Sequence, residues 1–326
     1  MEIVLYNWKW IPITIISILL LLIGYLVCII KLKPKKYIKW ISNGLIIIFS
    51  GILITIFIIK CLLASKSYIK YIKTNKIKHF NGNLKFVTYN INALPFTGKL
   101  YNQQKNYKLV EQFSKFDVVF LQEAFFMPTE MDKNNLSEIF NQAGFNVIMS
   151  PTPKFGNLEY FDAGLIIATK FPVINIDFQE YKEAENVDQF TNKGFLVVNT
   201  PNFTLINTHN QADYDSENEN EKLNGNHQNV RITQYKQITN YIKNNTHQKN
   251  ILLAGDFNIR NENRKYLKIY NYNNIEVYFY QLDGIITNAK IKNTLVLPLD
   301  NGFWDSDHRA ITATISTPFS SSSTKS

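Results

Sequence analysis

The sequence predicts a layered α/β domain preceded by a hairpin of two membrane-spanning helices. From about residue 80, short apolar runs of strand length alternate with helical patterns, which is typical of a layered α/β domain. Before that point the chain is dominated by two long, uncharged, apolar segments. Charge is divided in the same way: residues 1–79 hold 12 Lys and one Glu, whereas residues 80–326 hold 23 Lys and Arg against 25 Asp and Glu.

Composition excludes several classes of protein. The chain has 326 residues, of which 45% are apolar, so it can bury a sizeable core. Its two cysteines, Cys28 and Cys61, lie in or beside the apolar segments, which excludes a disulfide framework and a cysteine-based zinc site. The net charge of +9 belongs to the N-terminal segment. A nucleic-acid-binding protein would carry it on the folded domain, so no nucleic-acid partner is expected.

Residues 1–60 are expected to form the transmembrane hairpin, with spans at about 10–30 and 40–59. Each span is long enough to cross a bilayer and starts at a tryptophan, Trp10 or Trp40, as is typical of a membrane interface. A cleaved signal peptide is disfavoured, because a second span follows at once and no small-residue cleavage site is present. The expected location is therefore the membrane, as a multi-pass protein with two spans.

The flanks of the spans are basic. Seven lysines lie on the side that holds both termini, against five in the loop. Because the more basic side usually faces the cytosol, the catalytic domain is expected to be cytosolic. Residues 61–80 are predicted to be a basic juxtamembrane linker whose lysines, from Lys60 to Lys78, attract anionic lipid. The main domain is expected over residues 81–316, followed by a Ser-rich disordered tail over 317–326.

Nine apolar runs within the main domain predict strands, and two helical patterns predict helices. The strands are expected at 84–90, 117–123, 145–150, 164–170, 194–200, 203–209, 250–256, 282–288 and 309–316, and the helices at 106–116 and 229–245.

Several predicted strands end on, or begin close to, polar residues that can bind a metal or a phosphate. Asp256 and Asn258 follow one buried run two residues apart, a spacing that places both on one face of an extended strand. Read alone, Gly-Asp-Phe-Asn is more often a turn. Similar residues recur at other strands, however, and strand ends on one edge of a layered sheet form a crevice for ligands. The further candidates are Asn90, Glu123, His209, Asp283, Asp307 and His308.

This set, in this order, resembles the endonuclease/exonuclease/phosphatase superfamily, the fold of deoxyribonuclease I. The matching segments include LQEAF (121–125), LLAGDFN (252–258), LDGI (282–285) and SDH (306–308). Within the superfamily the chain is most similar to the neutral sphingomyelinases, in TYNINALP (88–95), FTNKGFLVV (190–198) and THNQAD (208–213). The resemblance implies a four-layer α/β sandwich. Only about 50 residues separate GDFN from SDH, fewer than in typical members.

The chemistry of phosphodiester hydrolysis suggests a role for each residue. Glu123 is a hard oxygen ligand suited to Mg²⁺, with Asn90 assisting and Asp307 contacting a second metal or orienting the site. His308 is the expected general base, because an ordinary histidine titrates near neutral pH. By resemblance, Asp283 accepts a hydrogen bond from the other nitrogen of that ring. Together these five residues are expected to bind the metal and to supply the general base of a hydrolase.

The remaining three positions are expected to act on the phosphate, the attacking water or the leaving group. His209 and Asn258 are suited to donate to the non-bridging oxygens of the phosphate. Asp256 is expected to orient the attacking water or to assist the leaving group.

The function expected from these residues is Mg²⁺-dependent cleavage of sphingomyelin to ceramide and phosphocholine at a membrane. The alternatives are another phosphoesterase of the same fold, either a nuclease or an inositol-phosphate phosphatase, and a non-catalytic membrane scaffold. The near-neutral main domain disfavours the nuclease, since phosphate-rich polymers usually meet clustered Lys and Arg. The scaffold is disfavoured because no catalytic position is substituted.

Overall fold

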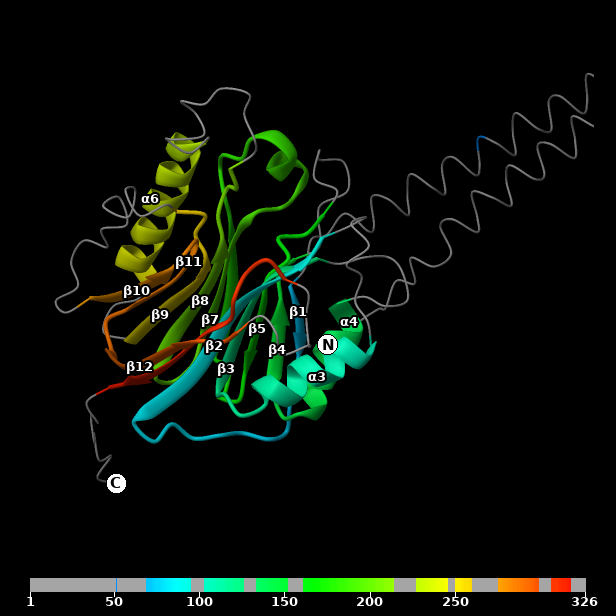
Figure 1. Ribbon diagram of the computed structural model, residues 1–326, viewed down its shortest axis with the longest axis vertical. Coiled ribbons are helices and arrows are strands. Elements are labelled where there is room, and N and C mark those ends of the chain that lie inside the picture. The colour runs from blue at the N-terminus through cyan, green and yellow to red at the C-terminus, as the bar shows by residue number, and fades with distance from the viewer. Residues whose placement is uncertain are drawn as a thin grey trace, which may run out of the picture. The chain divides into compact units, whose positions relative to one another are not determined.

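A computed structural model describes Gly51 and residues 69–94, 103–125, 133–151, 161–213, 227–245, 250–259, 275–298 and 306–317. Apart from Gly51, these residues belong to one compact unit. Two β-sheets form the centre of this unit, and helices cover the outer face of each sheet (Figure 1). The predicted four-layer α/β architecture is therefore confirmed for this unit.

The predicted location, a multi-pass membrane protein with two spans, is contradicted. In the part of the chain that the structure describes, no helix is long and apolar enough to cross a membrane. A crossing helix needs about 20 predominantly apolar residues. The longest described helix, α6 (Gln228–Asn245), has 18 residues and contains Arg231, Lys236 and Lys243. The segments on which the prediction was based, 10–30 and 40–59, lie outside the described residues apart from Gly51.

The first sheet has seven strands, and β2 and β3 form its parallel centre. All other neighbouring strands in this sheet are antiparallel. Its order is β1 (Lys70–Ile72), β4 (Asn146–Met149), β5 (Ile166–Thr169), β3 (Val118–Ala124), β2 (Asn83–Ala93), β13 (Ile311–Ser316) and β12 (Lys290–Val296).

The second sheet has six strands and repeats this plan, with β8 and β9 as its parallel pair. Its order is β10 (Glu276–Tyr280), β11 (Asp283–Thr287), β9 (Asn250–Asp256), β8 (Phe203–His209), β7 (Gly194–Asn199) and β6 (Asn175–Glu180). A short 3₁₀ helix, η1 (Asn186–Phe190), lies between β6 and β7 in the chain.

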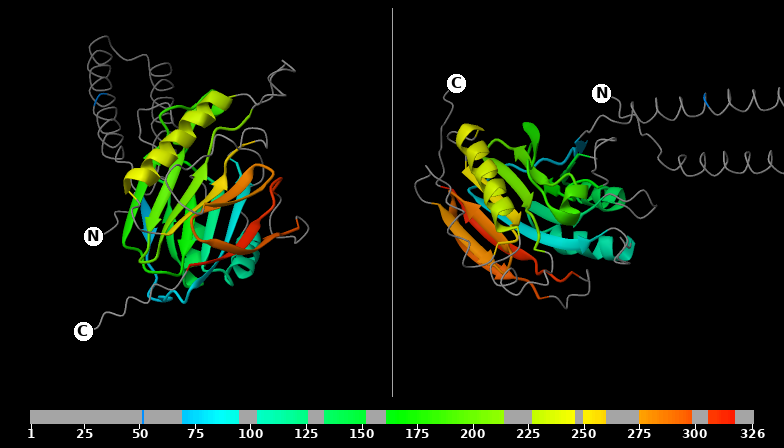
Figure 2. Two further views of the ribbon diagram at one scale, coloured as in Figure 1. Left: turned by 90° about the vertical axis from the view of Figure 1, so that its left-hand side faces the viewer. Right: turned by 90° about the horizontal axis from the view of Figure 1, so that it is seen from above.

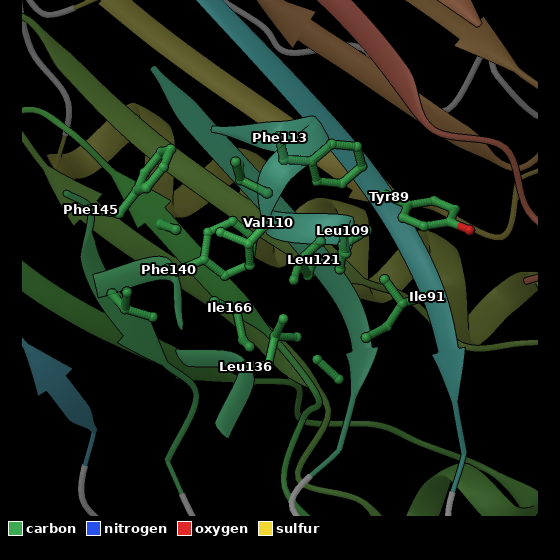
Figure 3. Packing of buried hydrophobic residues seen from close by; sticks show 14 of the residues in the cluster. Tyr89, Ile91, Leu109, Val110, Phe113, Leu121, Leu136, Phe140, Phe145 and Ile166 are labelled. Atoms are coloured by element: carbon green, nitrogen blue, oxygen red, sulfur yellow. The ribbon is translucent and has the colours of Figure 1, made fainter. Parts of the chain in front are cut away.

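Three apolar clusters hold the four layers together. One lies between the first sheet and the helices α3 (Gln103–Phe113) and α4 (Lys133–Gln142), and it contains Phe113 and Phe140 (Figure 3). A second fills the space between the sheets, and a third lies between the second sheet and α6. Figure 2 shows α6 along the outer face of the second sheet. Each large side chain removed from water here stabilises the fold by about 1.5–3 kcal/mol.

Alternation along the central strands decides which residues face the space between the sheets. On β2, Leu84 and Phe86 join the cluster between the sheets, whereas Val87 and Tyr89 join the helix-side cluster. Asn90 has the same parity as Phe86 and therefore faces the other sheet. The apolar filling of the inter-sheet space thus gives way to polar side chains towards the C-terminal end of β2.

All nine predicted strands and both predicted helices are present. Four strands escaped prediction: β1, β6, β10 and β12. These four are the edge strands of the two sheets. They are largely half-exposed, so they lack the continuous apolar runs that mark the central strands.

Part of the segment predicted as a linker over 61–80 is packed against the domain. Residues 69–80 include β1, and the Thr74 amide donates to the Asn146 side chain at 3.1 Å. Lys78 forms an ion pair of 2.6 Å with the buried carboxylate of Asp117, and Phe80 packs edge-on against two aromatic rings of the domain. Residues 69–80 therefore contribute to the fold. The predicted tail over 317–326 lies outside the described residues from residue 318 onward.

Candidate active site

Three candidate residues lie side by side across the second sheet. His209 ends β8, Asp256 ends β9 and Asp283 begins β11, and the strand register pairs Asp256 with both of the others. Paired residues on neighbouring strands point to the same face of a sheet. The register alone therefore brings these three side chains together. Gly255 permits the close approach of β8 and β9 here, because a Cβ on it would lie 2.1 Å from the Thr208 carbonyl oxygen.

The first sheet contributes Asn90 from β2 and Glu123 from β3. Regular alternation would turn Glu123 towards the helices, since Val119 and Leu121 lie in the helix-side cluster. Glu123 instead has a φ of +53°, in the left-handed region that non-glycine residues seldom adopt. This backbone conformation ends the alternation and allows the carboxylate to lie beside Asn90. Such departures cluster at functional sites.

The Asn90 amide joins the two sheets. Its Nδ2 donates to Glu123 Oε1 at 2.7 Å and to Asp256 Oδ2 at 3.0 Å, and it lies 3.5 Å from His308 Nε2. Its Oδ1 accepts from the Asn92 backbone at 2.9 Å, which fixes the amide with its nitrogen towards the carboxylates. Asn90 is fully buried.

Both ring nitrogens of His308 lie close to a carboxylate. Its Nδ1 lies 2.7 Å from Asp283 Oδ2, and its Nε2 lies 3.6 Å from Asp256 Oδ2. The His308 backbone amide donates to the Ser306 hydroxyl at 3.1 Å, and that hydroxyl donates to the Asn90 carbonyl at 2.6 Å. The Ser-Asp-His segment is thereby fastened to β2.

Two predicted site residues contact other groups. The exposed carboxylate of Asp307 accepts a hydrogen bond from Asn92 Nδ2 at 2.6 Å. Asn258 has a φ of +49°, its backbone N–H donates to Asp256 Oδ1, and its Nδ2 donates to the Asn210 carbonyl at 3.0 Å. Gly255 and Asp256 therefore end strand β9, and Phe257 and Asn258 follow it outside any helix or strand, with Asn258 tied back to the Asp256 side chain.

Lys193, which was not predicted from the sequence, also lies beside the candidate site residue His209. It is 3% exposed, and its Nζ lies 2.9 Å from Asp188 Oδ2, 2.9 Å from the Asn210 carbonyl and 3.3 Å from His209 Nε2. Lysine is rarely buried without a partner. Lys193 lies in the FTNKGFLVV segment, but the sequence of that segment does not distinguish a buried lysine from a solvent-exposed one.

Burial and clustered charge shift the proton affinities of the site. Burial raises the pKa of Glu123 to about 7, and the neighbouring Asp256 charge contributes in the same direction. Burial also lowers the pKa of His209 well below its usual value, with the Lys193 charge adding to this effect.

For His308, burial favours the neutral ring, but the carboxylates outweigh it. The hydrogen bond to Asp283 and the charges of Asp256, Asp283 and Asp307 together raise the pKa of His308 to about 10. Burial raises the pKa of Asp283 as well. The surrounding carboxylates therefore favour the protonated form of the His308 ring.

The arrangement fits a divalent cation. Ligand atoms of Glu123, His209 and Asp256 lie within 4.8 Å of one another, and so do those of Asp256, Asp283 and His308. Glu123 Oε2 is buried without a hydrogen-bond partner among the described residues. A buried carboxylate oxygen of this kind calls for a ligand, and carboxylate oxygens are the donors that Mg²⁺ prefers.

Comparisons with known proteins identify the fold and the family of the chain. A sphingomyelinase of Dictyostelium discoideum is 26% identical over 190 residues, which cover 49% of this chain and 42% of that protein. The chain thus spans less than half the length of that relative. Among solved structures, a beta toxin of Staphylococcus aureus with bound magnesium ions is similar with a TM-score of 0.52 and 20% identity, over 72% of this chain and all of the toxin.

Two further solved structures share the fold. Sphingomyelinase C of Streptomyces griseocarneus has a TM-score of 0.51 and 16% identity, over 73% of this chain and all of that one. A humanized TDP2 of D. rerio has a TM-score of 0.52 and 16% identity, over 72% of this chain and 99% of that one. Residues 87–320, which include every candidate site residue, match the Endonuclease/Exonuclease/phosphatase family. The chain therefore belongs to this family and has its deoxyribonuclease I-like fold.

Proposed function

We propose that the chain is a Mg²⁺-dependent phosphodiesterase that hydrolyses sphingomyelin to ceramide and phosphocholine. The observation that supports phosphodiester hydrolysis is the convergence of Glu123, Asp256, Asn90 and the His308–Asp283 pair at one point between the sheets. The choice of sphingomyelin is supported by the sequence similarity to the Dictyostelium sphingomyelinase.

Glu123 and Asp256 are the residues that would hold Mg²⁺, with Asn90 orienting both carboxylates. When bound there, the ion supplies neutralisation of the charge that develops on the phosphoryl oxygens. A cation held there would oppose the carboxylate field around His308 and so favour the neutral ring that a general base requires.

His308 takes the proton of the attacking water at Nε2, because Nδ1 is engaged by Asp283. The water oxygen bonds to phosphorus, the bond from phosphorus to the ceramide oxygen breaks, and that oxygen takes up a proton from solvent while His308 returns its proton to solvent. His209 and Asn258 lie on the second-sheet side, where they donate to the non-bridging phosphate oxygens. Asp307 is proposed to orient the Ser-Asp-His segment through its bond to Asn92.

The test is a substrate comparison with the purified full chain. Sphingomyelin in mixed micelles, a lysophospholipid and plasmid DNA are each incubated with Mg²⁺ or with EDTA. The His308→Ala variant serves as the control for contaminating hydrolases. We expect phosphocholine release from sphingomyelin with Mg²⁺ alone, lowered roughly 10²–10⁴-fold in the variant. Nicking of DNA with sphingomyelin intact would favour a nuclease, which the structural similarity to TDP2 keeps as the second candidate.

A further inference from the structure

One face of α6 carries three buried polar side chains that a core-facing helix does not ordinarily present. Arg231, Gln234 and Tyr235 are each 2% exposed or less, and their spacing of three and four residues places them on one face. Arg231 Nη1 donates to the Gln211 carbonyl at 3.1 Å, and the Tyr235 hydroxyl donates to the Phe257 carbonyl. Both carbonyls belong to the segments that leave β8 and β9.

Gln234 contacts the segment after β8 most directly. Its Oε1 accepts from Asn210 Nδ2 at 3.2 Å and from the Gln211 backbone at 2.9 Å, and its Nε2 donates to the Glu183 carbonyl at 2.9 Å. Asn210 Nδ2 also donates to the Tyr181 hydroxyl at 3.0 Å. The Gln234 side-chain amide thus accepts two hydrogen bonds and donates one inside the protein, where an unpaired polar group would cost about 1–3 kcal/mol.

Asn210 in turn fixes several groups of the candidate site. Its carbonyl oxygen accepts from Lys193 Nζ at 2.9 Å and from Asn258 Nδ2 at 3.0 Å. Its backbone N–H donates to the Asp256 carbonyl at 3.0 Å. The Asn258 side-chain amide carries two N–H groups that lie in one plane. Because one of them bonds the Asn210 carbonyl, the direction of the other is also set. The position of the Asn210 carbonyl oxygen therefore sets the direction of the Asn258 side-chain amide and the position of Lys193 Nζ beside His209.

From these contacts we infer that Gln234 and Tyr181 are positioning residues that act through Asn210 on the phosphate-binding side of the site. This inference rests on the proposed function, in which Asn258 and His209 donate to the phosphate. Gln234 and Tyr181 hold the Asn210 side chain, and the Asn210 carbonyl holds Lys193 and Asn258. Neither positioning residue touches the reacting atoms.

The magnitude follows from how steeply catalysis depends on geometry. A displacement of about 1 Å in a positioned group can lower the rate about 10²-fold, and loss of one donor to a developing oxyanion costs about 10²–10³-fold. Replacing Gln234 with Met keeps the chain length of the side chain but removes both acceptor contacts. We expect kcat to fall about 10–100-fold, with KM changed less than about threefold, because contacts to the rest of the substrate are retained.

The chain offers matched controls on the same elements. Thr239 lies on α6 as well, and its exposed hydroxyl bonds the Lys236 carbonyl of the same helix at 3.0 Å, away from Tyr181 and from the segments after β8 and β9. Thr239→Val should therefore change kcat less than about twofold. Tyr181→Phe removes only a hydroxyl and should lower kcat about 3–10-fold. Its control is Tyr241→Phe, since the Tyr241 hydroxyl donates to Asp177 at 2.9 Å.

The experiment measures kcat and KM on sphingomyelin micelles, Tm, and inorganic phosphate binding by calorimetry with Mg²⁺ present. Gln234→Met and Tyr181→Phe should weaken phosphate binding and lower kcat, whereas the two controls should not, even where Tm falls equally. Should Gln234→Met not fold, the Tyr181 pair decides the question. Equal phosphate affinity and kcat in variants and controls would overturn the positioning role. Absence of sphingomyelin cleavage by the unchanged chain would overturn only the proposed function, since phosphate binding still reports on the positioning.

Discussion

Replacing Asp283 with Asn should lower the pKa of His308. The change keeps the volume of the side chain but removes the negative charge that lies 2.7 Å from His308 Nδ1. Both side chains are largely buried, at 2% and 14% exposure, so solvent screens the interaction weakly. Because the carboxylate stabilises the protonated ring, its removal favours the neutral ring and moves the pKa downwards.

The size of the shift follows from the loss of charge at this hydrogen bond, whose acceptor becomes a neutral amide oxygen. A hydrogen bond between charged groups contributes roughly 1.5–3 kcal/mol, and one pKa unit corresponds to about 1.4 kcal/mol. The pKa of His308 should therefore fall from about 10 by roughly one to two units in the metal-free protein. Turnover should fall as well, since nothing anionic then holds the ring nitrogen.

The assay is an NMR titration of the histidine ring protons in the presence of EDTA. The chain has five histidines, so the His308→Ala spectrum identifies the signal to follow. Asp307→Asn is the matched control, because the Asp307 carboxylate is exposed and contributes least among the groups that raise this pKa. An unchanged pKa in Asp283→Asn, or an equal shift in both variants, would refute the reasoning.

Three further predictions concern the metal and the boundary of the domain. Adding Mg²⁺ should lower the pKa of His308 in the same NMR titration, because a dication opposes the carboxylate field; an unchanged pKa would place the ion elsewhere. Glu123→Gln should weaken Mg²⁺ binding at least about tenfold by calorimetry, since it removes an anionic ligand, and wild-type affinity would exclude Glu123 as a ligand. A chain beginning at Ile69 should have a higher Tm than one beginning at Asn81, because the shorter one lacks β1 and leaves the Asp117 carboxylate buried without Lys78. Equal Tm values would show that residues 69–80 contribute nothing to stability.

The central strands could be predicted from the sequence because their signal is local. A strand buried on both faces is rich in apolar residues, as in β3, β8 and β9, and β2 is buried from Phe86 onward. The edge strand β12 alternates between exposed and half-buried residues and contains Lys290 and Lys292, so nothing in its sequence distinguishes it from a loop. The candidate site residues could also be selected from the sequence, because polar side chains at the ends of apolar runs are conspicuous.

Only the tertiary structure decided how those side chains meet. Asn90 and Asp256 lie on different sheets and 166 positions apart, and no pattern along the chain predicts the hydrogen bond between their side chains. The direction of the Glu123 carboxylate depends on a left-handed backbone conformation that strand alternation would not suggest. The burial of Lys193, and the contact of Gln234 with Asn210, depend on helix and sheet packing. The physical reason is that strand formation follows from the period of neighbouring residues, whereas a site forms from non-local contacts that exist only once the two sheets and α6 have packed together.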